Sequence, residues 1–195
     1  MNIPELSQEE NLFDFFHEAV GKASASVGRP VSEDGVYYLS NLLVERGRAP
    51  EQPAPETLVD LQIQAREQGG AVATQAWREL GDRALYISGF FRASLNRRTV
   101  SLDYYLSMGA AAYDHLASAM RWSGSSGGFD VIYEELAQQF FACSTVLQRV
   151  RDEVRATTHA DILRLYEQWV THPDQGTAEQ LTALGVTPMR PGGES

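Results

Sequence analysis

The sequence predicts an all-α protein, a compact bundle of seven to eight helices around a central helix pair at about residues 71–96 and 102–122. Three observations predict this fold class. Apolar residues recur at three- and four-residue spacing through most of the chain, which is typical of amphipathic helices. No segment alternates apolar and polar residues between turn signals, so no sheet is expected. Breaks rich in glycine or proline separate the periodic segments at lengths typical of helices.

Two helices are expected before the proline-rich segment 49–56. Residues 7–10, Ser-Gln-Glu-Glu, form a capping box that starts a helix over about 8–26. Ser32 can cap a second helix that continues through residues 36–47. Residues 49–56 contain three prolines in eight positions and cannot be helical. We interpret them as a stiff surface loop, with an interdomain linker as the alternative.

Thr57 is expected to cap a short helix that leads into the central pair. The helix over about 102–122 is apolar nearly all round, which is typical of a helix at the centre of a bundle. A long helix over about 129–156 and two shorter ones, 159–171 and 176–184, follow. Residues 1–188 are therefore predicted to form one helical domain, and 189–195 a flexible tail.

Three glycines lie inside the predicted central helices: Gly81 and Gly89 in the first, Gly109 in the second. Glycine in a helix interior costs about 1 kcal/mol relative to alanine, so these positions indicate that something approaches the backbone closely. We expect a neighbouring helix, because small residues permit short distances between helix axes. The alternative is a flat ligand.

The charge of the chain argues against two classes of partner. The formal net charge is −10, and residues 1–60 contain 11 acidic and only four basic residues. Nucleic-acid binding depends on a basic face that neutralises phosphates, so we expect no nucleic acid as partner. No apolar run approaches the roughly 20 residues that span a bilayer, so no membrane is expected either. Without a secretory signal, and with a single cysteine that cannot form an internal disulfide, the sequence predicts a cytoplasmic protein.

Signatures of catalytic, metal and cofactor sites are missing from the sequence. It has no Glu-x-x-His pair and no His-Glu-x-x-His, and its four histidines are scattered. With no strand expected, it also has no nucleophile elbow, in which a Gly-x-Ser-x-Gly turn joins a strand to a helix. Cys143 lies on the apolar stripe of a helix, where a cysteine is normally a small buried hydrophobe. We therefore expect no metal and no cofactor, and can name no catalytic residue.

The candidate site consists of polar residues on the central helix pair. It comprises Asp82, Arg92, Tyr105, Tyr113 and His115. Buried charges must be paired, so Asp82 or Asp114 is expected to form a structural ion pair with Arg92. His115, flanked by small and apolar residues, is expected to be a hydrogen-bonded core histidine. The alternative is that the cluster binds a ligand or reacts with one.

Two blocks of the sequence resemble an uncharacterised bacterial family of hypothetical proteins. The blocks are Gly-Asp-x-x-Leu-aromatic-x-x-Gly, which begins at Gly81, and Leu-Tyr-Glu-x-Trp, which ends at Trp169. The resemblance covers about residues 75–188. It implies a single co-folding unit and carries no activity.

The sequence thus favours a non-enzymatic helical protein that acts through protein–protein contacts, including self-association. This prediction depends on the missing catalytic motifs, on the acidic N-terminal third, and on aromatic residues near helix starts. Those residues are Phe13, Phe15, Phe16, Tyr37 and Tyr38. The alternative is a helical-bundle enzyme or small-ligand binder that uses Asp82, Arg92, Tyr105 and His115.

Overall fold

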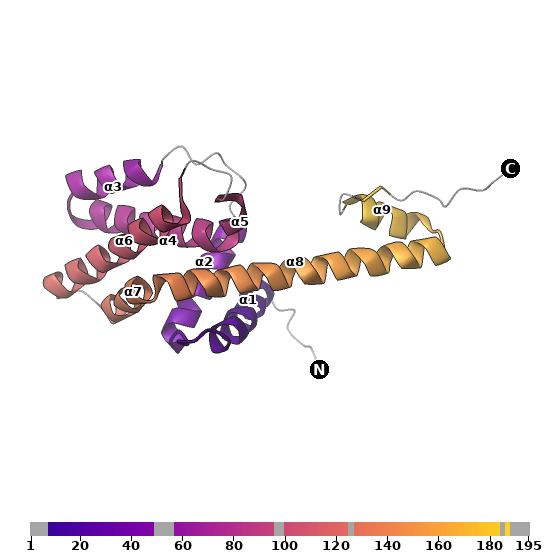
Figure 1. The fold of residues 1–195 in the computed structure, drawn as a ribbon, viewed down its shortest axis with the longest axis horizontal. Coiled ribbons are helices and arrows are strands. Elements are labelled where there is room, and N and C mark those ends of the chain that lie inside the picture. Colours follow the sequence, from indigo (N-terminus) through magenta and orange to yellow (C-terminus); the bar gives the residue numbers. More distant parts are fainter. Residues whose placement is uncertain (1–7, 49–56, 96–99, 125–126, 184–185, 188–195) are drawn as a thin grey trace. The chain divides into compact units, whose positions relative to one another are not determined.

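The computed structural model confirms the all-α fold class (Figure 1). It describes residues 8–48, 57–95, 100–124, 127–183 and 186–187, and within these ranges every regular element is a helix. The helices are α1 (Gln8–Ala25), α2 (Glu33–Arg48), α3 (Leu58–Glu67), α4 (Gly70–Phe90), α5 (Arg92–Leu95), α6 (Leu102–Ser123), α7 (Phe129–Gln138), α8 (Phe140–Thr171) and α9 (Gln175–Ala183). None of the helices described is long and apolar enough to cross a membrane.

The chain divides into two compact units, Met1–Val150 and Arg151–Ser195, and the boundary falls within α8. The expectation of one domain over 1–188 stays a prediction. The predicted loop at 49–56, the tail at 189–195 and the first residue of the capping box at 7–10 lie outside the described residues.

The predicted central pair is the core of the first unit. Helix α4 packs along α6, α3 covers α4, and α7 packs against α6 (Figure 1). Helices α1 and α2 pack together, and α2 also contacts α7 and α4. This arrangement places α2, α4 and α7 around the pocket described below.

Side-chain caps start several helices as the sequence predicts. Thr57 caps α3, and its hydroxyl and the Asp60 carboxylate form a complete capping box. The Ser32 hydroxyl accepts from the Gly35 amide at 3.1 Å, and the Ser32 amide donates to Glu135 of α7 at 2.8 Å. The cap of α2 therefore also ties that helix to α7.

Close helix packing at the three glycines is confirmed. A Cβ atom at Gly81 would lie 2.5 Å from the Tyr113 ring, and one at Gly89 would lie 2.6 Å from the Leu147 Cβ. At Gly109 it would meet the Phe140 ring and lie 2.9 Å from the Ala84 Cβ. Side chains of neighbouring helices, and no open groove, occupy these positions.

Two predicted helix boundaries are wrong. The helix predicted over about 71–96 ends at Phe90, and a separate short helix, α5, follows Phe91, where the backbone leaves helical geometry (φ −113°, ψ 15°). The sequence predicted a continuous helix over about 129–156 and a break before 159, whereas the chain breaks at Gln139 and α8 continues to Thr171. Residues 140–171 contain neither glycine nor proline, so nothing local stops the helix. At Gln139 the backbone leaves helical geometry (φ −109°, ψ 22°), and Phe140 directly after it is buried beside Gly109.

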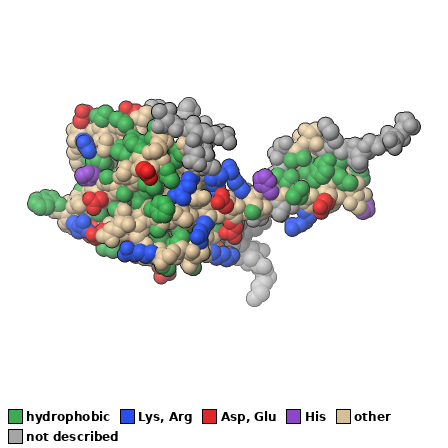
Figure 2. Space-filling model, in the orientation of Figure 1, with side chains coloured by type: hydrophobic (Ala, Val, Ile, Leu, Met, Phe, Trp, Pro, Cys, Tyr) green, Lys and Arg blue, Asp and Glu red, His purple; other side chains and the backbone are tan. Residues whose placement is uncertain are grey.

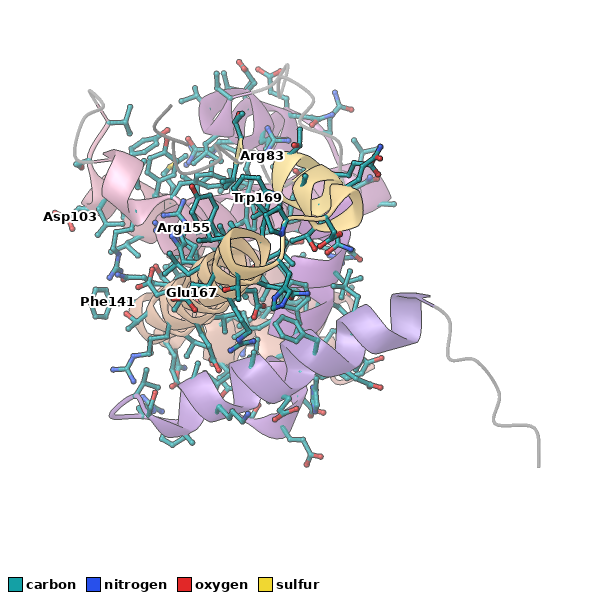
Figure 3. The ribbon with its side chains drawn as sticks, turned by 90° about the vertical axis from the view of Figure 1, so that its right-hand side faces the viewer. Arg83, Asp103, Phe141, Arg155, Glu167 and Trp169 are labelled. Carbon is teal, nitrogen blue, oxygen red and sulfur yellow. The ribbon has the colours of Figure 1, made fainter. Side chains whose placement is uncertain are left out.

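The second unit contains the C-terminal part of α8 and α9. Trp169 is buried on the side of α8 that faces α9, and Leu181 of α9 is buried as well (Figure 3). The Asp174 carboxylate accepts hydrogen bonds from the Thr177 amide at 2.8 Å and the Thr177 hydroxyl at 2.6 Å, which caps α9.

Candidate functional site

A buried carboxylate joins three helices of the first unit. Asp82 of α4 is only 4% exposed, and its Oδ1 accepts two phenolic hydrogen bonds. The Tyr38 hydroxyl of α2 donates to it at 2.5 Å and the Tyr113 hydroxyl of α6 at 2.7 Å. Hydrogen bonds to a charged acceptor are about twice as strong as neutral ones, so they hold α2, α4 and α6 in register.

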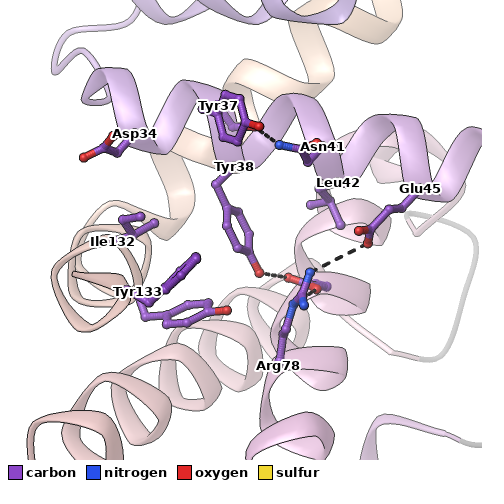
Figure 4. Close-up of a pocket in the computed structure, with 11 residues that line it drawn as sticks. Asp34, Tyr37, Tyr38, Asn41, Leu42, Glu45, Arg78, Ile132 and Tyr133 are labelled. Atoms are coloured by element: carbon purple, nitrogen blue, oxygen red, sulfur yellow. Dashed lines mark hydrogen bonds and ion pairs between the residues drawn. The ribbon is translucent and has the colours of Figure 1, made fainter. Parts of the chain in front are cut away.

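Arg78 connects this carboxylate to the surface. It lies one helical turn before Asp82, and its Nε is 3.4 Å from Asp82 Oδ2. Its Nη2 lies 3.8 Å from Glu45 Oε2 on α2, and its side chain is 47% exposed. The guanidinium therefore lies between a buried and an exposed carboxylate (Figure 4).

Burial sets the protonation of the tyrosines. It raises the pKa of Tyr38 and Tyr113 well above the ordinary phenol value, and the negative charge of Asp82 raises it further. Burial also raises the pKa of Asp82, and the two phenol donors and Arg78 act in the opposite direction. Both phenols are thus neutral hydrogen-bond donors at physiological pH.

A pocket of about 240 Å³ opens beside this cluster, between α2, α4 and α7. Four aromatic side chains line it: Tyr37, Tyr38, Phe129 and Tyr133. Tyr38 and Tyr133 meet edge to face with ring centroids 5.5 Å apart, and Asp82 is also part of the lining. Figure 4 shows Tyr38 reaching from α2 toward α4, with Tyr133 and Arg78 beside it.

A second pocket, of about 380 Å³, adjoins the first. The two share Arg78, Phe129 and Tyr133 as lining residues. The remaining wall of the second pocket comes from α4 and α6 and includes Leu116 and Met120. The three shared side chains are therefore the partition between the two pockets.

The structure brings together only two of the five predicted site residues, Asp82 and Tyr113. The predicted ion pair of Arg92 with Asp82 or Asp114 is wrong. Arg92 lies in α5, beyond the end of α4, and donates instead to Gln148 and Ser144 of α8 at 2.7 and 3.3 Å. Asp114 is exposed on α6.

The remaining predicted site residues lie apart from the cluster. Arg92 stacks over the Phe141 ring at 5.3 Å, and that ring points outward from α8 (Figure 3). His115 is exposed, which corrects its interpretation as a core histidine, and its ring stacks on Trp77 with centroids 4.6 Å apart. Tyr105 is buried and meets the edge of Tyr104.

Sequence reasoning missed Tyr38, Arg78 and Tyr133. Arg78 could have been found, because its spacing of four residues before Asp82 is that of a helical ion pair. Tyr38 was singled out only as an aromatic residue near a helix start, and it is buried because its ring turns toward α4. Nothing in the local pattern indicates an acceptor 44 positions away.

Other reactive groups lie outside this site. Among the described residues, no three histidine, cysteine, aspartate or glutamate side chains gather as metal ligands would. Cys143 is buried as predicted, and burial together with the charge of Glu135 raises the pKa of its thiol to about 12. The thiol is therefore unsuited to nucleophilic chemistry.

Comparison of the chain with protein-family models, curated proteins and solved structures gives no match. The resemblance to a bacterial family stays a prediction, and a function must be argued from the geometry of the site.

Proposed function

We propose that the protein is a non-enzymatic binding protein for a small organic molecule held in the pocket between α2, α4 and α7. The observation that supports this function is the aromatic pocket beside the buried Asp82 cluster. Ligand sites typically combine aromatic walls with a few fixed polar groups. Tyr38, Asp82 and Arg78 are fixed here by one another.

The same geometry supports binding without reaction. The phenols of Tyr38 and Tyr113 are engaged with Asp82 and stay protonated, so neither is a ready base or nucleophile. Cys143 and His115 do not line the pocket. The pocket therefore supports binding through non-covalent contacts alone.

A thermal-shift screen of small molecules tests the proposal with a matched pair of variants. Asn41 lines the pocket and is partly exposed, so Asn41→Trp should fill the pocket while the helix persists. Ala111→Trp adds the same ring at an exposed position on α6 that does not line the pocket.

Molecules that occupy the pocket should raise the melting temperature of the wild type and of Ala111→Trp but not of Asn41→Trp. A ligand at 100 times its Kd stabilises a protein by about 2.7 kcal/mol, which such a screen detects. If no molecule acts, or if all three proteins respond alike, the proposal is wrong.

A second candidate function is contact with a protein partner or self-association, as the sequence predicts. It is favoured by exposed apolar side chains where α6 ends and α7 begins. Trp122 is 94% exposed, and Phe129 and Val131 are also exposed. Figure 2 shows an apolar projection at this end of α6. Clustered exposed apolar residues often mark interaction sites.

Sedimentation equilibrium of the wild type and of Trp122→Ser/Val131→Ser tests self-association. A mass that falls to that of the monomer in the double variant would support it, and equal masses would contradict it. A cytoplasmic location and the expected lack of nucleic-acid and membrane partners remain proposals drawn from the sequence.

A further inference from the structure

On the basis of the proposed function, we infer that the ligand is an amphipathic organic cation. Its positive head lies in the aromatic pocket near Asp82, and its apolar tail crosses Phe129 and Tyr133 into the adjoining pocket. Charge, aromatic surface and the junction of the two pockets each contribute to this assignment.

The charges that line the aromatic pocket favour a cation. Among the described residues that line it, three carboxylates (Asp34, Glu45 and Asp82) face a single guanidinium, that of Arg78. Two of those carboxylates already lie within 4 Å of Arg78, so its charge is compensated before any ligand arrives. The lining therefore carries a formal excess of two negative charges. An anion would be repelled, and a cation attracted.

The aromatic walls favour the same class of ligand. Tyr37, Tyr38, Phe129 and Tyr133 surround the space, and aromatic faces attract ammonium groups that approach within about 6 Å. Phe129 and Tyr133 stack with centroids 6.4 Å apart, while Tyr38 meets Tyr133 nearly at a right angle. A head group in this corner meets ring faces and carboxylates together.

The adjoining pocket differs in character. Among the described residues no carboxylate lines it, and Ala71, Leu116 and Met120 contribute apolar wall. Thr74, Gln75 and the shared Arg78 complete the lining. Because Phe129 and Tyr133 belong to both pockets, a chain of methylenes that follows these rings passes from the acidic pocket to the apolar wall of the adjoining one. The ligand class is thus an alkyl- or arylalkylammonium with an extended tail.

Calorimetric titration with four probes tests the inference: butylammonium, octylammonium, octanoate and octanol. Octylammonium should bind more tightly than butylammonium, by up to about fourfold for each methylene that is buried. Octanoate should bind more weakly than octylammonium, and the affinity for octanol should be intermediate.

Two pairs of variants separate the contribution of the ligand's charged head to binding from that of its apolar tail. Asp34→Asn/Glu45→Gln neutralises two exposed carboxylates of the pocket. It should lower the affinity for both ammonium probes by about threefold to tenfold, because each exposed charge contributes little to binding. Asp14→Asn/Glu67→Gln makes the same change in net charge at exposed positions elsewhere and should leave both affinities unchanged. Ala71→Trp, which fills part of the adjoining pocket, should lower the affinity for octylammonium to that for butylammonium and leave the affinity for butylammonium unchanged. Ala111→Trp should change neither affinity.

Each contrary result has a distinct meaning. The inference is overturned if octanoate binds at least as well as octylammonium, if chain-length dependence survives Ala71→Trp, or if neither ammonium probe binds at millimolar concentration. In those cases the pocket function still stands if the thermal-shift screen finds molecules that Asn41→Trp excludes. An empty screen overturns both.

Discussion

Tyr38 and Asp82, 44 positions apart in the sequence, share a buried hydrogen bond with an Oη–Oδ1 distance of 2.5 Å. The same carboxylate oxygen accepts from Tyr113, so a single acceptor joins α2, α4 and α6. This bond fixes part of the pocket wall, because Tyr38 lines the pocket and its hydroxyl is held by Asp82.

A double-mutant cycle measures this bond. Tyr38→Phe should lower the free energy of unfolding by about 1–2 kcal/mol, because the buried Asp82 carboxylate loses a donor. Asp82→Asn should lower it by about 1–3 kcal/mol, because the two buried phenols lose a charged acceptor. The two losses should not add, with a coupling energy of about 0.5–3 kcal/mol. Urea unfolding gives the four stabilities.

Tyr37→Phe is the matched control, since it removes the same hydroxyl from the neighbouring, exposed ring. Its effect should stay within about 0.5 kcal/mol. Additive losses for Tyr38 and Asp82, or an equal loss for Tyr37, would contradict the assigned bond.

Glycine substitutions test the close packing of the central helices. Gly89→Leu and Gly109→Leu should each lower the free energy of unfolding by more than about 2 kcal/mol through overpacking. Gly21→Ala is the control, because nothing lies within 4 Å of its added methyl group, and it should stabilise α1 by about 0.5–1 kcal/mol. Unchanged melting temperatures for both leucine variants would contradict the packing.

Helical periodicity and polar caps are local properties, and the sequence was sufficient to predict them. The same holds for the burial of Cys143 and the close contacts at Gly81, Gly89 and Gly109, because each follows from a stripe on one helix. The break at Gln139 carries no glycine or proline, so no local signal marks it.

The candidate site could be predicted only in part. Asp82 and Tyr113 were found because polar residues are conspicuous on apolar helices. Their true partners depend on how helices distant in sequence pack, so Tyr38 was missed and Arg92 was paired wrongly. Arg78 could have been predicted from the local sequence, because it precedes Asp82 by four residues.

Glu79 should make stability depend on pH in the acidic range. Burial raises the pKa of its carboxyl, but hydrogen bonds from Arg46 and Arg83, both at 2.8 Å, outweigh burial and bring the pKa below its ordinary value of 4.5. A lowered pKa in the folded state means that the stabilisation is present above about pH 4.5 and is lost as pH falls through the folded pKa.

Urea unfolding of the wild type and of Glu79→Gln between pH 3 and 7 checks this dependence. The wild type should lose more stability than the variant on acidification. Glu18→Gln, which breaks the fully exposed pair with Lys22, should follow the wild type more closely at physiological ionic strength, because solvent screens that pair. Identical acid slopes for the wild type and Glu79→Gln would contradict the assignment.

The thiol of Cys143 should be inert in the folded protein. Its pKa of about 12 leaves almost no thiolate at neutral pH, and it is fully buried. A thiol-specific reagent should label it slowly in buffer and rapidly in denaturing urea, as followed by mass spectrometry. Fast labelling of the folded protein would show that this part of α8 opens readily.

Nuclear magnetic resonance of ring-labelled tyrosines tests the ligand pocket most directly, because the chain carries its own internal controls. A molecule that binds there should shift the ring signals of Tyr37, Tyr38 and Tyr133 in a saturable manner. It should leave Tyr86, Tyr104 and Tyr166, which do not line the pocket, unchanged, and Asn41→Trp should abolish the shifts. If no molecule perturbs the three pocket tyrosines, or if all six signals move alike, the pocket is not a ligand site.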